Sequence, residues 1–414
     1  MATTSATELL LMTAKYDSVL SMARQLKGPA VAELGSVALV HDFLIDYRGG
    51  ERVFKVLCDL FPEADIYSPI YNVDGTRGVF AGRSVQTSYL NRIGPTDATF
   101  RRLLPFYPRA TESLDLSAYD LIISSSSAWA HGVIAREGQR HLSYCHNPFR
   151  YAWDQRDSAT AGRGDAASGV LERVLSRWRA WDRAVSSEVD LYLANGEITR
   201  ERIARCFGRS SGLLYPPVDT ERFSLGTAGE RYVVLSELME HKRIDVIVSA
   251  FSDLGMPLTV IGDGPDLTRL ASLSGSSVEF AGRLSDDDVA RTLQSSAALV
   301  QCATEEFGIA SVEAQAAGRP VLALAEGGAL ETVRPGVTGE HFASPDVETL
   351  KAALSIFDPA AYVPGDCVAN AERFSITAFG QGIEDAVGTL GATPEAPRLR
   401  HRERRRGLWR KGIA

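Results

Sequence analysis

Residues 215–223 read YPPVDTERF, a proline-containing stretch that interrupts a regular alternation of short apolar runs and longer amphipathic runs. The apolar runs have the length and the β-rich composition of strands. Those before the prolines are VALVHDF (37–43), ADIYSPIY (64–71), DLIISSSS (120–127), HLSYCHN (141–147) and DLYLANG (190–196). Those after the prolines are YVVLSEL (232–238), PLTVIGDG (257–264), SVEFAGR (277–283), AALVQCA (297–303) and PVLALAE (320–326). The chain is therefore divided into two consecutive series of predicted strands.

The predicted strands are almost continuously apolar, and helix-like segments separate them. This pattern is typical of parallel sheets that are covered by helices on both faces. Two such series joined by one link predict an α/β protein with two doubly wound domains, and 414 residues are too many for one ordinary core. The expected parts are a helical extension at 1–35, a first domain at 36–215, a second domain at 216–370, a helix at 371–390 that could cross back to the first domain, and a tail at 391–414.

Composition and cysteine spacing restrict the class of protein. The chain is 45% hydrophobic and 23% charged, as soluble globular proteins are. Its five cysteines are scattered without a CxxC pair or metal-ligand spacing, which favours reduced thiols in a cytoplasm over a disulfide framework. No apolar run approaches the roughly 20 residues that span a bilayer. We therefore expect a cytoplasmic protein.

The charge is unevenly distributed. The formal net charge is −8, but the tail RLRHRERRRGLWRK (398–411) carries eight basic residues and one Glu. Such a tail suits an anionic membrane surface, where each cation contributes about 1 kcal/mol. We favour this partner over nucleic acid, with a plain disordered tail as the alternative. The expected location is then peripheral, on the inner face of the cell membrane.

Functional residues should lie just after the strands, because ligands of doubly wound sheets bind at the carboxyl ends of the strands. The residues at these positions are HDFLIDYRGGE, SSSSAWAHG, CHNPFR, ANGE and GDGP. They are rich in Gly, Ser, His and Asn, whereas the strand interiors are apolar. This partition predicts a ligand site at the carboxyl ends of the strands.

The stretch ATEEFGIASVEAQAAGRP (303–320) follows one predicted strand and carries two carboxylates. Gly308 disfavours helix, so a helix should begin just beyond it and carry Glu313 inward, with Glu305 in the preceding loop. The free N–H groups of a first helical turn favour an anion, while carboxylates accept hydrogen bonds from hydroxyl groups. A nucleotide diphosphate sugar offers both. The alternative is a capped, solvated surface helix.

At this point the sequence resembles a known family, the GT-B fold, retaining glycosyltransferases of family 4, particularly the bacterial mannosyl- and rhamnosyltransferases of polysaccharide pathways. The resemblance runs from about residue 37 to about residue 339. It rests on HDF, RGGERV, DLSAYDLIISSS, SYCHNPFRYAWD, RAWDRAVSSEVDLYLANGEITRERI, YPPVDTERF, HKRIDVIVSAF, VIGDGP, the E-x7-E stretch and GGALETV. It implies two Rossmann-like domains that face each other across a cleft.

The resemblance also implies roles for residues of the E-x7-E stretch. The first glutamate of this motif, Glu305 here, meets the donor sugar, and the second, Glu313, meets the ribose. The backbone N–H groups of Phe307, Gly308 and Ile309 would lie near the donor phosphates.

Further site residues follow from other motifs of the family. Lys242 in HKRID matches the lysine that contacts the diphosphate, and Gly49 and Gly50 match a glycine-rich turn where the backbone approaches the donor phosphates. Arg283 is a candidate for the base pocket, with packing as the alternative. His146 in YCHNP matches the family at the end of a strand that faces the cleft.

Two positions depart from the family pattern. Relatives usually have an arginine where this chain has Glu237, and a charge reversal near a diphosphate is unfavourable. Relatives commonly have a histidine where this chain has Ser127. His131 could substitute for it as a catalytic residue, or it is an ordinary helix histidine.

The implied activity is transfer of a hexose, with GDP-mannose as the expected donor, to a lipid-linked or growing glycan acceptor with retention of configuration. No cofactor other than the nucleotide sugar and no metal is expected, because cationic side chains and helix N-termini take the place of the metal. Ser285 before three Asp residues accordingly predicts a capped helix start. The alternative, motivated by Glu237 and Ser127, is a donor-binding scaffold subunit of a polysaccharide assembly complex.

Overall fold

The computed structural model describes residues 35–154 and 165–392 of the chain. They form two compact units. Unit 1 contains the residues up to Asn195, Thr199–Leu214 and the chain from Gly380, and unit 2 contains Gly196–Ile198 and Tyr215–Phe379. The main division thus falls between Leu214 and Tyr215, in the proline-containing link. The predicted extension at 1–35 (apart from Gly35) and the basic tail at 398–411 lie outside the described residues.

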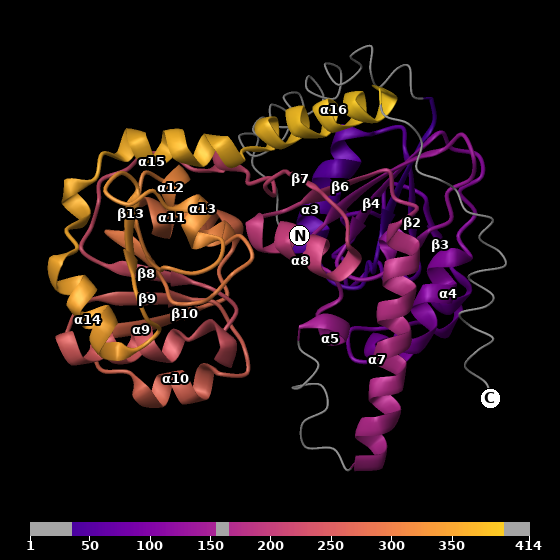
Figure 1. Cartoon of the computed structure of the whole chain (residues 1–414). Helices are drawn as coiled ribbons and strands as arrows, with labels where there is room; N and C mark the ends of the chain where they lie inside the picture. Colours follow the sequence, from indigo (N-terminus) through magenta and orange to yellow (C-terminus); the bar gives the residue numbers. More distant parts are fainter. Residues whose placement is uncertain (1–34, 155–164, 393–414) are drawn as a thin grey trace, which may run out of the picture. The chain divides into compact units, whose positions relative to one another are not determined.

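In the described part of unit 1, seven strands form one parallel sheet in the order β3-β2-β1-β4-β5-β6-β7 (Figure 1). The strands are β1 (Val37–His41), β2 (Asp65–Ser68), β3 (Val85–Thr87), β4 (Leu121–Ser126), β5 (Arg140–Cys145), β6 (Leu191–Ala194) and β7 (Gly212–Leu213). The helices are α3 (Gly49–Leu60), α4 (Tyr107–Glu112), α5 (Arg150–Trp153), α7 (Asp165–Ser186) and α8 (Glu197–Phe207), with 3-10 turns η1 (Tyr89–Ile93), η2 (Phe100–Phe106) and η3 (Ala130–Gly132).

In unit 2, six described strands form a second parallel sheet in the order β10-β9-β8-β11-β12-β13. They are β8 (Tyr232–Leu235), β9 (Leu258–Ile261), β10 (Val278–Gly282), β11 (Ala298–Gln301), β12 (Val321–Leu324) and β13 (Gly339–Phe342). The helices are α9 (Ile244–Leu254), α10 (Leu267–Leu273), α11 (Asp286–Gln294), α12 (Ile309–Ala316), α13 (Ala329–Thr332), α14 (Val347–Ile356), α15 (Pro364–Ala371) and the first turn of α16 (Ile376–Ala392), with 3-10 turns η4 (Thr220–Arg222), η5 (Glu240–Lys242), η6 (Pro359–Ala361) and η7 (Glu372–Phe374).

The predicted fold class and the ten predicted strands are confirmed. Both central strands are buried on both faces, as the apolar runs indicate: Ala38, Leu39 and Val40 of β1 are fully buried, and Val233 and Val234 of β8 nearly so. The strands β3, β7 and β13 were not predicted. Each is an edge strand of two to four residues, and an edge strand needs no continuous apolar run.

Each sheet has one topological switch point, where the strand order reverses. In unit 1 it lies between β1 and β4, and in unit 2 between β8 and β11. The crevice at the carboxyl ends of these two strands is the preferred ligand position of a doubly wound sheet. The residues that follow β1 and β4 in unit 1, and those that follow β8 and β11 in unit 2, are therefore the candidate ligand-binding residues of each unit.

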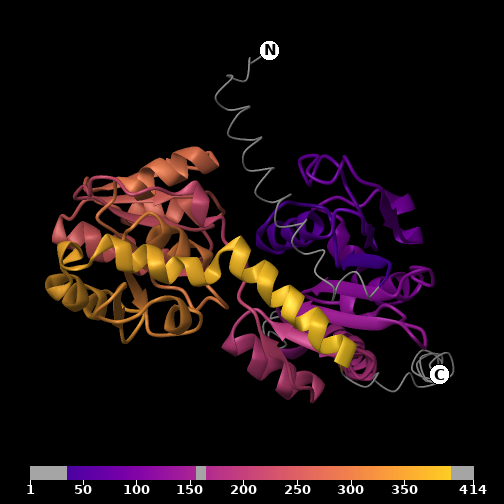
Figure 2. The same ribbon diagram turned by 90° about the horizontal axis from the view of Figure 1, so that it is seen from above.

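The last described helix, α16, contributes residues to both units, and its second part packs on unit 1 (Figure 2). There the Arg140 Nη2 group donates to the Leu390 carbonyl oxygen at 2.8 Å, and a Cβ atom on Gly382 would clash with the Leu214 side chain. The absence of a Cβ thus allows α16 to lie close to the end of the first domain.

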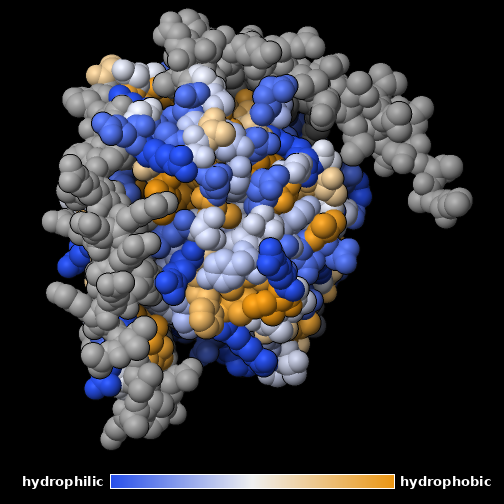
Figure 3. All heavy atoms as spheres, turned by 90° about the vertical axis from the view of Figure 1, so that its right-hand side faces the viewer, coloured by the Kyte–Doolittle hydropathy of each residue, from blue (hydrophilic) through white to orange (hydrophobic). Residues whose placement is uncertain are grey.

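Two further expectations can be compared with the structure. All five cysteines are free and buried. Within the described residues, no helix is both long and apolar enough to cross a membrane. On the face that Figure 3 shows, hydrophobic side chains lie among hydrophilic ones.

Candidate active site

An ion pair lies at the switch point of unit 2. Lys242 ends the turn η5 that follows β8, and Glu305 lies in the loop that follows β11. The Lys242 Nζ atom is 2.5 Å from Glu305 Oε1, and the two side chains are 18% and 25% exposed. Two residues predicted from separate motifs therefore meet at the carboxyl ends of adjacent strands, and both remain accessible.

The helix α12 begins directly after this loop, as predicted. Gly308 precedes its first residue with a φ of 86°, a left-handed conformation that favours glycine. In the described part of the chain, the backbone N–H groups of Phe307, Gly308 and Ile309 donate to no protein acceptor. These free donors, at the positive end of the helix dipole, form a site for an anion.

Contacts with Gln301 and the packing of the Phe307 ring hold the turn at Gly308 in place. The Gln301 Oε1 atom accepts a 2.7 Å hydrogen bond from Ser311 Oγ, and a Cβ atom at Gly308 would lie 3.2 Å from Gln301 Nε2. The Phe307 ring is buried against Tyr215 and Phe374, with ring centroids 5.7 and 5.2 Å away. The Phe307 side chain is thus an anchor, while its backbone N–H is the group available to a ligand.

Glu313 is buried in α12, as predicted, and is paired with an arginine that the sequence analysis did not identify. Arg222 Nη2 lies 2.7 Å from Glu313 Oε1, and Arg222 Nη1 lies 3.3 Å from Asp286 Oδ2 of α11. The guanidinium also stacks 4.7 Å from the Phe223 ring centroid. Arg222 therefore keeps a nearly buried carboxylate in one position with compensated charge.

Two other residues of unit 2 singled out from the sequence, Arg283 and Glu237, are exposed. Arg283 follows the edge strand β10, two strands from β8, and is exposed. Glu237, in the loop between β8 and η5, is exposed and has no ion-pair partner among the described residues. An exposed carboxylate that points to solvent is screened by water, which lessens its repulsion of a nearby anion. Ser285 caps α11 by accepting from the Asp288 N–H, as predicted.

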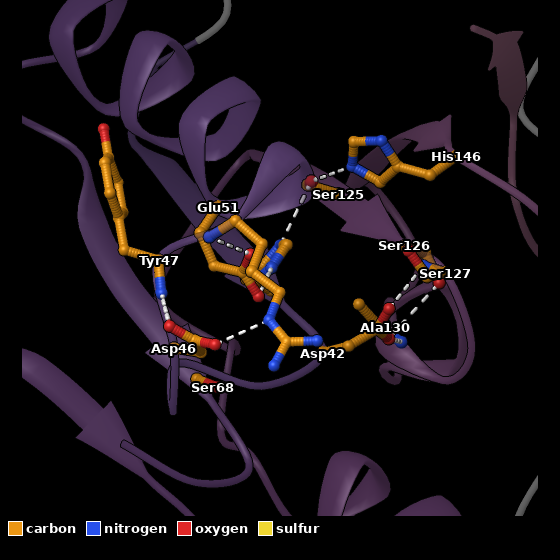
Figure 4. A network of polar contacts seen from close by, with 12 residues as sticks. Asp42, Asp46, Tyr47, Glu51, Ser68, Ser125, Ser126, Ser127, Ala130 and His146 are labelled. Atoms are coloured by element: carbon orange, nitrogen blue, oxygen red, sulfur yellow. Dashed lines mark hydrogen bonds and ion pairs between the residues drawn. The ribbon is translucent and has the colours of Figure 1, made fainter. Parts of the chain in front are cut away.

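A second polar arrangement lies at the switch point of unit 1 (Figure 4). Asp42 follows β1 and is buried, and its carboxylate accepts the backbone N–H groups of Ser127, Ala128, Trp129 and Ala130, which follow β4. The bonds to Ala128, Trp129 and Ala130 are 3.0, 2.7 and 2.5 Å long. These four N–H groups are thus bonded to a carboxylate of the protein itself and are not available to an anionic ligand.

Beside Asp42, the structure brings His146 and the glycine turn together. Gly49 and Gly50 begin α3, and a Cβ atom at Gly50 would lie 3.8 Å from His41 Cε1 and 3.9 Å from His146 Nε2. These are ordinary contact distances, so the fold itself does not require glycine at position 50. The Ser125 hydroxyl lies 3.1 Å from His41 Nδ1 and 2.8 Å from His146 Nε2.

His131 has no free ring nitrogen. It is buried, its Nε2 atom lies 3.2 Å from Asp182 Oδ1, and its Nδ1 atom lies 3.2 Å from the Tyr192 hydroxyl. Trp153 Nε1 donates to the other oxygen of Asp182 at 2.8 Å. This position corrects the hypothesis that His131 substitutes for the missing histidine, because no ring nitrogen remains to meet a ligand. Ser127, where relatives have that histidine, is itself exposed.

The position of His146 has a consequence for stability at low pH. Burial, with a smaller contribution from His41, lowers its pKa from 6.5 to about 3. Below pH 6.5 the unfolded chain takes up a proton that the folded chain does not, so stability falls as the pH falls. We expect the native protein to lose about 2 kcal/mol more than a His146→Gln variant between pH 6.5 and about pH 4.5. Urea unfolding at several pH values measures this; parallel curves for the two proteins would contradict the lowered pKa.

In sum, the structure brings Lys242, Glu305 and the free N–H groups together in unit 2, and Gly50 and His146 together in unit 1. Five residues that hold the site in place could not be identified from the sequence: His41, Asp42, Ser125, Arg222 and Gln301. The only available signal was their position near the end of a predicted strand, or, for Arg222, in YPPVDTERF.

Two family models match consecutive parts of the chain. The model of Glycosyltransferase Family 4 matches residues 47–222, and the model of Glycosyl transferases group 1 matches residues 218–357. The two matches meet at the proline-containing link. The chain belongs to the family 4-like glycosyltransferases. The resemblance stated from the motifs is thereby confirmed.

Curated relatives of this glycosyltransferase occur in mycobacteria. A GDP-mannose-dependent alpha-(1-6)-phosphatidylinositol monomannoside mannosyltransferase of Mycobacterium tuberculosis is 33% identical over 190 residues, which are 38% of this chain and 49% of the relative. A D-inositol 3-phosphate glycosyltransferase of Mycobacterium marinum is 28% identical over 224 residues, 48% of this chain and 47% of the relative. The chain spans about half the length of these curated relatives.

Solved structures share the fold at lower identity. HepE of Anabaena, solved in complex with UDP, is 15% identical with a TM-score of 0.60, and the match covers 86% of this chain and 100% of that one. Sucrose-phosphate synthase of Thermosynechococcus elongatus is 15% identical with a TM-score of 0.62, covering 86% and 99%. Together with the two parallel sheets, these matches show that this glycosyltransferase has the two-domain GT-B fold.

Proposed function

We propose that this chain transfers a hexose, specifically mannose, from a nucleoside diphosphate sugar to a lipid-linked or growing glycan acceptor, with retention of the anomeric configuration and without a metal. The observation that carries the proposal is the Lys242–Glu305 pair, which lies at the switch point of unit 2 beside three free backbone N–H groups. One cation, one carboxylate and a helix start match the chemistry of a diphosphate joined to a sugar.

Each group of unit 2 has a role in this reaction. The N–H groups of Phe307, Gly308 and Ile309 would bind phosphate oxygens. The Lys242 ammonium has three N–H donors, so it can bind a phosphate oxygen while it keeps its bond to Glu305. Glu305 would then accept hydrogen bonds from the sugar hydroxyls, and Glu313, held by Arg222, would accept them from the ribose.

The chemical step breaks the bond between the anomeric carbon and the leaving diphosphate. The negative charge that develops on the diphosphate is stabilised by Lys242 and the start of α12, which are already in position. The acceptor hydroxyl attacks on the same face, and its proton passes to the leaving phosphate. This route needs no side-chain nucleophile.

The donor base and the sugar rest on the names of relatives. The mannosyltransferase of Mycobacterium tuberculosis is described as GDP-mannose-dependent and as acting on phosphatidylinositol monomannoside. HepE was solved with UDP, but its identity of 15% is half that of the mycobacterial relative. GDP-mannose and a mannosylated inositol lipid are therefore the substrates to test first.

A thermal-shift panel of nucleoside diphosphates tests donor binding directly. A ligand at a hundredfold excess over its Kd stabilises the folded state by about 2.7 kcal/mol. We expect GDP to raise the melting temperature by about 5 °C, and ADP and CDP to leave it unchanged. A larger shift with UDP would identify uracil instead of guanine as the donor base. No shift with any nucleotide would overturn the proposal.

Turnover separates the enzyme from the scaffold alternative. The purified chain is incubated with GDP-mannose and phosphatidylinositol monomannoside, and the release of GDP and the mannosylated lipid are measured. We expect both products in equal amounts. GDP binding without release of GDP, with this lipid and with mannose oligosaccharides, would favour the donor-binding scaffold.

A further inference from the structure

Four side chains of unit 1 form a continuous polar chain that the transfer reaction, as described above, does not use. Glu51 Oε1 lies 3.7 Å from His41 Nε2, His41 Nδ1 lies 3.1 Å from Ser125 Oγ, and Ser125 Oγ lies 2.8 Å from His146 Nε2. Figure 4 shows Glu51 at one end and His146 at the other, with Ser125 between them. The His41 ring faces Ser125 with its Nδ1 atom, and the His146 ring faces it with its Nε2 atom.

The sheet register places these groups next to one another. His41 and Ser125 are directly paired residues of the parallel strands β1 and β4, although 84 residues separate them in the chain. β5 lies on the other side of β4, and His146 directly follows it. The His41 ring is stacked on Phe54, with centroids 4.7 Å apart and planes at 22°, and the Arg48 N–H donates to Glu51 Oε2 at 3.0 Å. The orientation of each member is thus fixed by packing or by a second hydrogen bond.

The hydrogen bonds at Ser125 can run in either direction, because the roles of the two ring nitrogens depend on the tautomer; for a neutral His41 ring, one direction is favoured. Glu51 is too far from His41 for a hydrogen bond, but its negative charge favours the tautomer with the proton on the nearer nitrogen, Nε2. His41 Nδ1 is then an acceptor, so Ser125 must donate its single hydroxyl proton to it. The Ser125 oxygen is left to accept from His146, which therefore carries its proton on Nε2.

This arrangement leaves the Nδ1 atom of His146 with a free lone pair. Among the described residues, no group is bonded to His146 Nδ1. The backbone of His146 is held on both sides, because its N–H donates to the Ser126 carbonyl at 2.8 Å and its carbonyl accepts from Thr199 Oγ1 at 3.1 Å. The ring is consequently a fixed hydrogen-bond acceptor at the carboxyl edge of the sheet.

We infer that Glu51, His41 and Ser125 are positioning residues that hold His146 as its Nε2–H tautomer, so that Nδ1 accepts a hydrogen bond from a hydroxyl group of a bound sugar. The inference rests on the proposed function, since it assigns a sugar ligand to this edge of unit 1. The pKa of about 3 agrees with a neutral ring that accepts a hydrogen bond.

The tautomer can be measured on the full chain without any substrate. Long-range ¹H–¹⁵N NMR of protein labelled at histidine distinguishes the Nε2–H form, the Nδ1–H form and the charged ring, and a His146→Gln variant assigns the signal. We expect His146 as the Nε2–H form at pH 7, and a mixture of tautomers in Ser125→Ala and in Glu51→Gln. A charged ring or the Nδ1–H form in the native protein would overturn the inference.

A matched control lies one residue away on the same strand. The Ser124 hydroxyl lies 2.9 Å from His141 Nε2, and Ser124 is as deeply buried as Ser125, but its side chain points to the opposite face of the sheet. Ser124→Ala thus breaks a hydrogen bond of the same kind. It should alter the signal of His141 and leave that of His146 unchanged; an equal change of His146 in both variants would show a general loss of structure and contradict the assigned role.

Kinetics test whether the fixed tautomer matters for transfer. We expect Ser125→Ala to lower kcat/KM for mannosyl transfer at least about tenfold, while the thermal shift with GDP and the activity of Ser124→Ala stay near those of the native protein. Ser125→Thr, which keeps the hydroxyl, should restore most of the rate. Full activity of Ser125→Ala would overturn the inference, whereas absence of GDP binding and turnover in the native protein would instead contradict the proposed function.

Discussion

Replacement of Lys242 with alanine is expected to lower kcat for mannosyl transfer by about a hundredfold to a thousandfold, the usual effect of removing one donor that stabilises developing charge. Lys242 is the cation that bonds to Glu305 at the switch point of unit 2. Without it, the leaving diphosphate would keep only the start of α12, and Glu305 would add its negative charge without compensation. Release of GDP from GDP-mannose at saturating acceptor measures the effect.

The loss of activity should not reflect unfolding. The Lys242–Glu305 pair is partly exposed, and such pairs contribute at most about 1 kcal/mol to stability. Lys351→Ala is a suitable control, because Lys351 also pairs with two carboxylates of unit 2, at 3.1 and 3.3 Å, but lies on α14. Normal activity of Lys242→Ala, or an equal loss in Lys351→Ala, would rule out the assigned role.

Gly328→Ala is expected to destabilise unit 2 by about 3 kcal/mol and to abolish the thermal shift with GDP. A Cβ atom on Gly328 would lie within 3 Å of the Phe307 Cα and carbonyl oxygen atoms. These backbone atoms cannot easily move, because the Phe307 ring is anchored in the core and the Gly328 N–H donates to the Glu305 carbonyl oxygen at 2.8 Å. The methyl group would push away the segment that carries Glu305 and the free N–H groups.

A second glycine provides the comparison. Gly365 lies in α15 of the same unit, and no atom lies within 4 Å of the position of its Cβ. Gly365→Ala should therefore leave GDP binding unchanged and increase stability by up to about 1 kcal/mol, because alanine restricts the unfolded chain and favours helix. Urea unfolding and thermal shift measure both variants. Native-like GDP binding by Gly328→Ala would mean that the loop does not depend on this contact.

The central strands could be predicted because they are covered on both faces, so their sequences are apolar without interruption. Of the four edge strands that the structure describes, only β10 was predicted. β3 (VQT), β7 (GL) and β13 (GEHF) lie at the borders of their sheets, where one side needs no partner and polar residues are tolerated. Their sequences resemble those of loops, and only their neighbours in the sheet make them strands.

The site was predictable to the extent that it consists of local motifs. Glu305, Gly308 and Glu313 fall in one stretch, and the start of α12 could be placed from Gly308 alone. Contacts between distant segments could not be placed. The register that joins His41 to Ser125 and the ion pair of Arg222 with Glu313 depend on tertiary packing, which no spacing within a short motif reveals.

The carboxylate of Asp42 gives unit 1 a selectivity that unit 2 does not have. It occupies the ring of backbone N–H groups after β4, so a phosphate approaching those groups would meet a negative charge instead of empty donors. In unit 2 the corresponding N–H groups at the start of α12 donate to no acceptor among the residues that the structure describes. Under the proposed function, a diphosphate would therefore be bound in unit 2, whereas the position after β4 in unit 1 would favour a hydroxyl-bearing part of a ligand over a phosphate group.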